Sequence, residues 1–231
     1  MLGVGRAEEH RAALRALGTD AWPAYLDAHS GLPGPRGNIE LALVLADLAP
    51  AALADALIAS GDEYRTFCEV VALGRRAHDP AVLARLHAHA ADERWRVREA
   101  VAMALQRLGD DDLPALQDAV LAWADDPDPL VQRAAAAAVC EPRLLRTPAA
   151  AAVAVEVCRR ATAALAARPA DARRHTDVRT LRQGLGYCWS VAVAADPEPG
   201  LVAFEALDDS DPDVAWVVRE NLRKKRLARL V

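Results

Sequence analysis

Apolar residues recur at every third or fourth position over most of the chain, which is the spacing of one face of an α-helix. A clear example is the stripe formed by Val97, Val101, Ala104, Leu105 and Leu108. No segment shows the sustained alternation of apolar and polar residues that is typical of a half-buried strand. The pattern therefore predicts an all-α fold without a sheet.

A turn-and-helix pattern occurs three times along the chain. In each copy, acidic and turn-forming residues precede a valine that opens an apolar helix, and these valines are Val97, Val131 and Val214. An apolar helix is also predicted before each copy, at 80–91, 112–124 and 198–207. An aspartate before a helix accepts hydrogen bonds from its free N–H groups, and proline fits the first helical turn. We therefore expect a series of paired helices.

Two further copies are less regular. One consists of an alanine-rich helix at 148–167 and a helix that begins at Thr176, and a weaker one runs from Gly61 to Gly74. Gly109 is predicted to end the helix that carries Val97. The second helices of the five pairs are predicted at 62–76, 93–108, 129–141, 177–194 and 212–228.

The first 60 residues follow a different pattern. Helices are predicted at 6–17, 20–28, 39–48 and 51–60. The loop 30–38 contains three glycines and two prolines, and Asn38 is well placed to cap the following helix. The loop lacks the Gly-Lys-Ser/Thr ending of a phosphate-binding loop, so we discount nucleotide binding. The simplest role for residues 1–60 is a cap over the apolar edge of the first repeat.

The repeated segments resemble the HEAT-repeat family. The resemblance rests on the aspartate-rich turns, on the pairs Val97-Arg98 and Val131-Gln132, and on the alanine-rich second helix that ends in Ala104-Leu105. It covers roughly residues 61–231. It implies an α-solenoid of about four to five helical hairpins, a single continuous domain after the cap of residues 1–60. It also implies that the second helix of each pair lines a concave face.

Composition and charge agree with this interpretation. Alanine, the best helix former, accounts for 53 of the 231 residues, whereas aromatic residues make up only 4%. The net charge is −5, yet residues 213–231 hold six cations and two carboxylates. Such a basic end indicates an anionic partner, or it simply complements the C-terminus of a last helix. No stretch is long and apolar enough for a membrane helix, and the start of the chain lacks a signal sequence, so we expect a cytoplasmic protein.

The sequence contains no motif for catalysis or for cofactor binding. The four cysteines show no Cys-x-x-Cys spacing and lie in apolar helical patterns, so we expect buried, reduced thiols. His87 and His89 point about 200° apart on a helix and cannot share a metal. We therefore predict no catalytic residue, no metal site and no cofactor, although enzymatic activity stays an open question.

The candidate binding residues are tryptophans and arginines on the predicted second helices. Trp95 precedes Glu99 by four residues and Trp216 precedes Glu220 by four, so each pair shares one helical face. The predicted contacts are Arg94, Trp95, Arg98, Arg182, Trp216 and Arg219. Packing between repeats for the two tryptophans, and pairing with local acids for the arginines, is the alternative. Trp189, Trp22 and Trp123 are predicted to be structural.

Two functions from different classes follow. The first hypothesis is a non-enzymatic scaffold whose concave face binds a macromolecular partner, with a protein favoured over a nucleic acid. The alternative is a DNA-repair protein similar to the AlkD-like alkylpurine DNA glycosylases, which the two Trp–Glu pairs resemble. The chain departs from those enzymes in its acidity and in having Glu where they use Asp. Nothing in the sequence selects a third possibility, a regulator of a partner enzyme, or indicates an oligomeric state.

Overall fold

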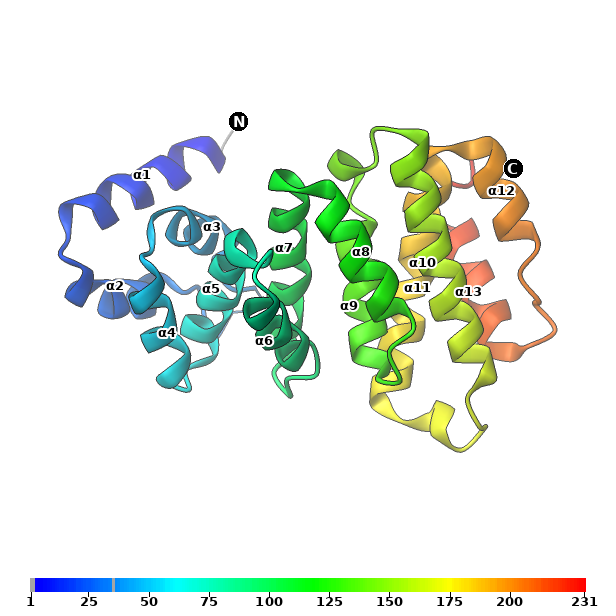
Figure 1. Cartoon of the computed structure of the whole chain (residues 1–231), viewed down its shortest axis with the longest axis horizontal. Helices are drawn as coiled ribbons and strands as arrows, with labels where there is room; N and C mark the ends of the chain where they lie inside the picture. The colour runs from blue at the N-terminus through cyan, green and yellow to red at the C-terminus, as the bar shows by residue number, and fades with distance from the viewer. Residues whose placement is uncertain (1–2, 35) are drawn as a thin grey trace. The chain divides into compact units, whose positions relative to one another are not determined.

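The computed structural model describes residues 3–34 and 36–231, and these residues form helices joined by turns (Figure 1). No strand occurs among them, which confirms the all-α prediction. The chain divides into two compact units, Met1–Arg107 and Leu108–Val231, hereafter the N-terminal and C-terminal units. A boundary near residue 60 stays a prediction.

The N-terminal unit is built around helix α5. Its helices are α1 (Gly3–Ala16), α2 (Trp22–His29), α3 (Ile39–Leu48), α4 (Ala51–Ala59), α5 (Glu63–Leu73), α6 (Pro80–Ala90) and most of α7 (Trp95–Asp111). Helices α2, α3, α4 and α6 all pack against α5. The hydroxyl of Tyr64 donates to the carbonyl of Asn38 at 2.7 Å, which ties the start of α5 to the loop before α3. Helices α2, α3 and α4 thus pack on the helix that begins after Asp62, while a cap formed by residues 1–60 stays a prediction.

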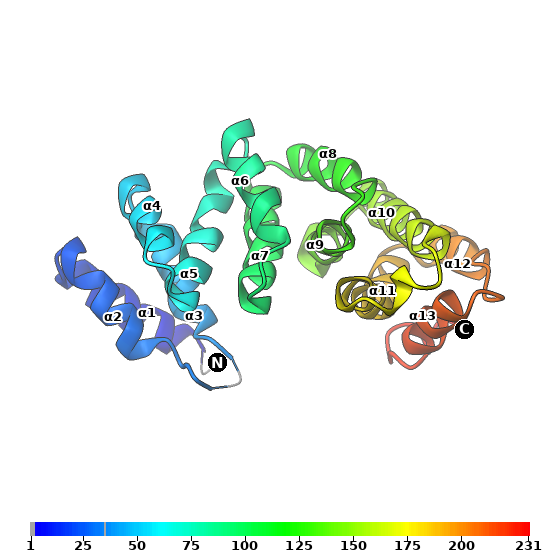
Figure 2. The ribbon, with the colours of Figure 1, turned by 90° about the horizontal axis from the view of Figure 1, so that it is seen from below.

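The C-terminal unit consists of two layers of helices (Figure 2). Its helices are α8 (Leu113–Ala124), α9 (Pro129–Val139), α10 (Pro148–Ala167), α11 (Thr176–Ala195), α12 (Pro197–Glu205) and α13 (Pro212–Leu222). Helices α8, α10 and α12 form the first layer, and α9, α11 and α13 form the second. Consecutive helices make three pairs here, and α4/α5 and α6/α7 make two more. These pairs agree with the prediction of about four to five helical hairpins.

Aspartates start several of the second helices. The carboxylate of Asp62 accepts from the backbone N–H of Arg65 at 2.8 Å, and that of Asp128 accepts from Leu130 at 2.7 Å. Asp211 accepts from two backbone N–H groups at the start of α13. Asn38 caps α3 in the same way. The prediction that the acidic turns serve as helix caps is therefore confirmed.

A valine occupies the third position of four second helices. These residues are Val97 in α7, Val131 in α9, Val178 in α11 and Val214 in α13, and all four are buried. In α9 and α13 a capping aspartate precedes this valine by three residues, so the cap and the core anchor recur at the same spacing in the sequence. The equal placement of these valines supports repeated helical hairpins in both units.

Two predicted helix ends are wrong. Gly109 does not end α7, which continues to Asp111. A Cβ atom at Gly109 would lie 2.5 Å from Cδ2 of Leu116, so this glycine allows close packing on α8. Helix α13 ends at Leu222 and not at 228. Beyond it the chain forms tight turns that bury Leu227, with Lys224 N–H donating to Asn221 O at 2.9 Å.

Three of the tryptophans and all four cysteines lie in the core. Trp22, Trp123 and Trp189 are buried, as predicted, and the indole N–H of Trp189 donates to Oγ1 of Thr162 at 3.0 Å. All four cysteines are buried, as predicted, and the structure places them as free thiols. Trp95 and Trp216 are therefore the two tryptophans outside the buried core.

Candidate functional site

The six predicted contact residues fall into two groups, one in each unit. Arg94, Trp95 and Arg98 lie at the start of α7 in the N-terminal unit, whereas Arg182, Trp216 and Arg219 lie on α11 and α13 in the C-terminal unit. One groove that runs through both groups stays a prediction.

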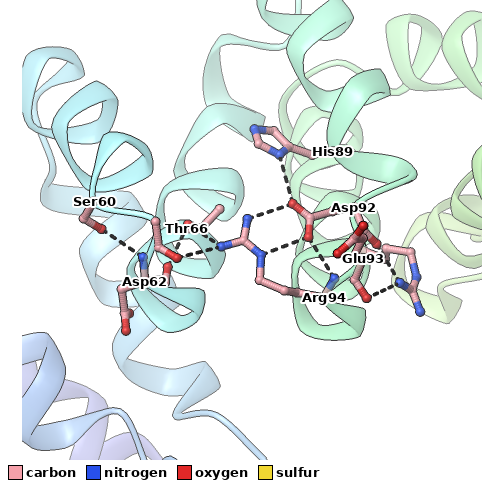
Figure 3. A network of polar contacts seen from close by, with 9 residues as sticks. Ser60, Asp62, Thr66, His89, Asp92, Glu93 and Arg94 are labelled. Carbon is pink, nitrogen blue, oxygen red and sulfur yellow. Dashed lines mark hydrogen bonds and ion pairs between the residues drawn. The ribbon is translucent and has the colours of Figure 1, made fainter.

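Arg94 connects the turn before α7 to the start of α5 (Figure 3). Its guanidinium makes two hydrogen bonds to the Asp92 carboxylate, at 2.9 and 2.8 Å, and a third to the carbonyl of Gly61 at 3.1 Å. The hydrogen bonds from Arg94 hold the pKa of Asp92 below its usual range. His89 lies 3.9 Å from the same carboxylate, and burial lowers its pKa. Arg94 is thus engaged inside the protein.

Arg98 also serves the turn before α7. Its Nη1 donates to the backbone carbonyls of Asp92 at 2.6 Å and Glu93 at 3.0 Å. These carbonyls belong to the residues that precede the helix, so Arg98 links this turn to the first turn of α7. Hydrogen bonds within the protein account for both Arg94 and Arg98, and we place neither in the candidate site.

Trp95 is the exposed tryptophan of the N-terminal unit. Its side chain is 48% exposed, and the guanidinium carbon of Arg96 lies 4.6 Å from the centre of its ring. Arg96 is fixed in turn by the carboxylate of Glu63 and the carbonyl of Gly34, each at 3.1 Å. The indole is therefore held in place from one side while much of it faces solvent.

A cavity of about 190 Å³ lies beside this indole. We call it the Trp95 pocket, and it is lined by Arg36, Gly37, Ile39, Phe67, Trp95, Arg96, Glu99 and Met103. Ile39 at its edge is 45% exposed, and Phe67 is buried. The lining is thus mainly apolar, with two arginines and one carboxylate. Such a surface suits an apolar side chain accompanied by polar groups.

Sequence reasoning missed most of the pocket's lining. Trp95, Glu99 and Met103 follow one another at four-residue spacing on α7, so Met103 was detectable as part of the same helical face. Ile39 and Phe67 come from α3 and α5, and only the fold brings them beside α7. No pattern in the sequence signals that proximity.

Trp216 in the C-terminal unit packs mainly against α11. A Cβ atom at Gly186 would lie 2.7 Å from Cζ3 of Trp216, so the glycine leaves room for the ring. The guanidinium carbon of Arg182 lies 4.8 Å from the ring centre, and Nη1 of Arg182 donates a hydrogen bond to Oδ1 of Asp213 at 2.5 Å. Arg219 is exposed, and among the described residues it has no hydrogen-bond or ion-pair partner. The packing alternative thus describes Trp216 better than a binding role does.

Both members of the Trp216–Glu220 pair contact neighbouring groups of their own unit. Glu220 accepts a hydrogen bond from Nη1 of Arg223 at 2.6 Å, and its Cβ lies beside Gly186 together with the ring of Trp216. This pair is one of the two on which the resemblance to DNA glycosylases rested. Its carboxylate and its ring are both used within the protein.

The described part of the chain holds no group of three or more His, Cys, Asp or Glu residues placed to hold a metal ion. None of its helices combines the length and apolarity that crossing a bilayer requires.

Comparison with known families found one match. The family model described as HEAT repeats matches residues 50–140, the stretch that includes helices α4 to α9. Neither the comparison with curated proteins nor the comparison with solved structures found a match. The family match and the valine-anchored hairpins support the same conclusion about the architecture.

Proposed function

We propose that this HEAT-repeat protein is a non-enzymatic scaffold that binds a protein partner, with the Trp95 pocket as its main contact. HEAT repeats generally serve as scaffolds for protein interaction. The observation that carries the proposal is the exposed indole of Trp95 beside an apolar cavity on the second helix of a repeat. Tryptophan is among the residues that most often dominate binding energy at protein interfaces.

The charges around the pocket favour a protein over a nucleic acid. The N-terminal unit holds 12 cations and 14 carboxylates, a net charge of −2. Arg96 is already paired with Glu63, and Glu99 adds a negative charge to the lining. Nucleic-acid affinity depends on cations free to neutralise phosphates. An apolar side chain of a protein fits the floor formed by Phe67 and Met103 better.

The chemistry of the lining is suited to binding. Its members are arginine, glycine, isoleucine, phenylalanine, tryptophan, glutamate and methionine. Glu99 is the one member of a type that acts as nucleophile or base, and no second such group stands beside it in the lining. A single carboxylate beside two guanidinium groups is suited to orienting a bound polar group.

A pull-down from an extract of the source organism tests the proposal. Trp95→Ala removes the exposed ring and should abolish recovery of the partner, since hot-spot truncations cost about 2 kcal/mol or more. Val202→Ala, which removes an exposed apolar side chain on α12, is the matched control. Unchanged recovery with Trp95→Ala, in a variant with wild-type helical content, would contradict the proposal.

The DNA-repair alternative is separated by its own assay. If the protein releases bases from methylated duplex DNA, and Glu99→Gln abolishes that release, the scaffold proposal is replaced by the glycosylase. We expect no release by the wild type, because the carboxylate of Glu99 lies in a unit with a net charge of −2 and not on a cationic surface that would hold DNA. Duplex binding that weakens steeply with salt would be a first indication of the alternative.

A further inference from the structure

The C-terminal unit has a second surface suited to binding, away from the tryptophans. A cavity of about 480 Å³ is lined by Pro142, Leu145, Val191, Ala194, Ala195 and Arg226. We call it the α11 groove. It lies between the turn that follows α9, the C-terminal end of α11 and the turns that follow α13. Five of its six lining residues are apolar, and Arg226 is the only charged one.

An exposed tyrosine extends the groove along α11. Tyr187 lies one helical turn before Val191, and its side chain is 46% exposed. The guanidinium carbon of Arg226 lies 5.1 Å from the ring centre, Nη2 of Arg226 donates to Oη of Tyr187 at 2.9 Å, and Nζ of Lys224 lies 5.9 Å from the ring. Neither cation has a carboxylate partner among the described residues. Arg226 at the groove is therefore held against the Tyr187 ring, Lys224 lies near the same ring, and neither cation is neutralised by an anion of the described residues.

The wider surroundings of the groove are also basic. Helix α11, helix α13 and the residues after α13 hold eight cations and three carboxylates, a net charge of +5. Two of those carboxylates, Asp213 and Glu220, are already paired with Arg182 and Arg223. The rest of the C-terminal unit holds eight cations and sixteen carboxylates, a net charge of −8. These elements thus hold half of the sixteen cations of the C-terminal unit and only three of its nineteen carboxylates.

We propose that the α11 groove binds an acidic segment of a partner protein in which an aliphatic side chain stands next to carboxylates. This inference rests on the proposed scaffold function and adds a second contact to it. The aliphatic group fills the floor formed by Leu145, Val191 and Ala194. The neighbouring carboxylates meet Arg226 and Lys224, which gain the anionic partners that they lack.

A nucleic acid fits this groove less well. Its bases present polar edges, whereas the floor offers only apolar side chains to them. Arg226 already lies over the Tyr187 ring and donates to its hydroxyl, so it competes with a base for stacking on that face. A carboxylate of a peptide pairs with Arg226 and leaves the contact between Arg226 and Tyr187 intact.

Fluorescence anisotropy with a labelled short peptide of alternating leucine and glutamate tests the inference on the full chain. The probes for comparison are the leucine–glutamine and alanine–glutamate peptides and a short single-stranded DNA. We expect the leucine–glutamate peptide to bind more tightly than each of these probes, and to lose affinity as salt is added. No binding of that peptide, or equal or tighter binding of the glutamine peptide or the DNA, would overturn the inference.

Three variants locate the binding on the groove. The double variant Lys224→Ala, Arg226→Ala should weaken binding at least tenfold, equivalent to about 1.4 kcal/mol. Ala194→Gln, at an exposed position, should weaken it by filling the groove without a change in charge. Arg159→Ala is the matched control, because it removes a cation from α10 in the other helical layer. A loss with Arg159→Ala equal to that of the double variant would reduce the effect to net charge and overturn the inference.

The same assay separates this inference from the scaffold proposal. Trp95→Ala should bind the leucine–glutamate peptide as the wild type does, since the Trp95 pocket belongs to the N-terminal unit. Loss of partner recovery with Trp95→Ala, without peptide binding by the α11 groove, would leave the scaffold proposal standing alone.

Discussion

At the scale of single residues, neighbours in the sequence have opposite roles. Arg94 and Trp95 stand side by side, and sequence reasoning assigned both to the same contact surface. Arg94 is engaged by Asp92 and Gly61, whereas Trp95 is half exposed beside a cavity. Sequence patterns identify residues that can bind. They do not show which of them the protein's own backbone already occupies.

Asp92→Asn should lower the free energy of unfolding by about 1–3 kcal/mol at pH 7, the usual range for a charged hydrogen bond in a partly buried site. The reason is that Arg94 would keep its charge without its carboxylate partner. Urea denaturation measures the change. Asp20→Asn is the control, because Asp20 is exposed. An equal effect of the two substitutions would contradict the role of the Asp92–Arg94 pair.

The difference in unfolding free energy between the wild type and Asp92→Asn should also depend on pH. The pKa of Asp92 is lowered in the folded state, so its contribution is fully present above the unfolded value of about 4. It is lost as the pH falls through the folded pKa. The stability difference between wild type and Asp92→Asn should therefore shrink in acid. A difference that stays constant down to pH 2 or so would contradict this linkage.

At the scale of helices, most elements were predictable because caps and core anchors repeat along the chain. The aspartate caps and the third-position valines locate α7, α9 and α13 within a few residues. The ends were harder to predict. Gly109 was interpreted as a stop although it serves close packing, and the chain after Leu222 turns to bury Leu227. A glycine can end a helix or allow close packing, and an amphipathic stretch can continue a helix or form turns. The packing of neighbouring helices decides between them.

Gly74→Ala tests a close approach between helices. A Cβ atom at Gly74 would lie 2.3 Å from the carbonyl oxygen of Ala104 and 2.8 Å from its Cα. These are backbone atoms of α7, so the helices must separate, and we expect a loss of about 1–3 kcal/mol in unfolding free energy. Gly18→Ala is the control, since nothing lies within 4 Å of its added carbon. Thermal unfolding of both variants distinguishes packing from a general glycine effect.

At the scale of the whole molecule, the chain buries every thiol. Burial raises the pKa of the Cys68 thiol, and the contact with Cys158 raises that of Cys140. We expect no rapid reaction of the native protein with a thiol-specific reagent near pH 8, and reaction of all four cysteines after unfolding in urea. Prompt labelling of even one cysteine in the native protein would contradict the burial of that residue.

The candidate site was less predictable than the architecture, because its residues come from separate segments of the chain. Residues of one helix share a face by their spacing, so Trp95 and Glu99 were found together. The pocket and the groove join residues from three segments each, and such neighbours depend on how the helices pack. Tyr187 carries no signal of a surface role in the sequence, because its cationic neighbours follow it by more than 35 residues.

The exposed indole of Trp95 also has an optical consequence. The other four tryptophans are buried or half-buried, so the red-edge emission and the iodide-quenchable fraction of the protein's fluorescence come chiefly from this one ring. Arg96 lies over the same ring and would report any rearrangement there as a change in intensity. The molecule therefore carries a built-in, label-free reporter of whether its pocket is occupied.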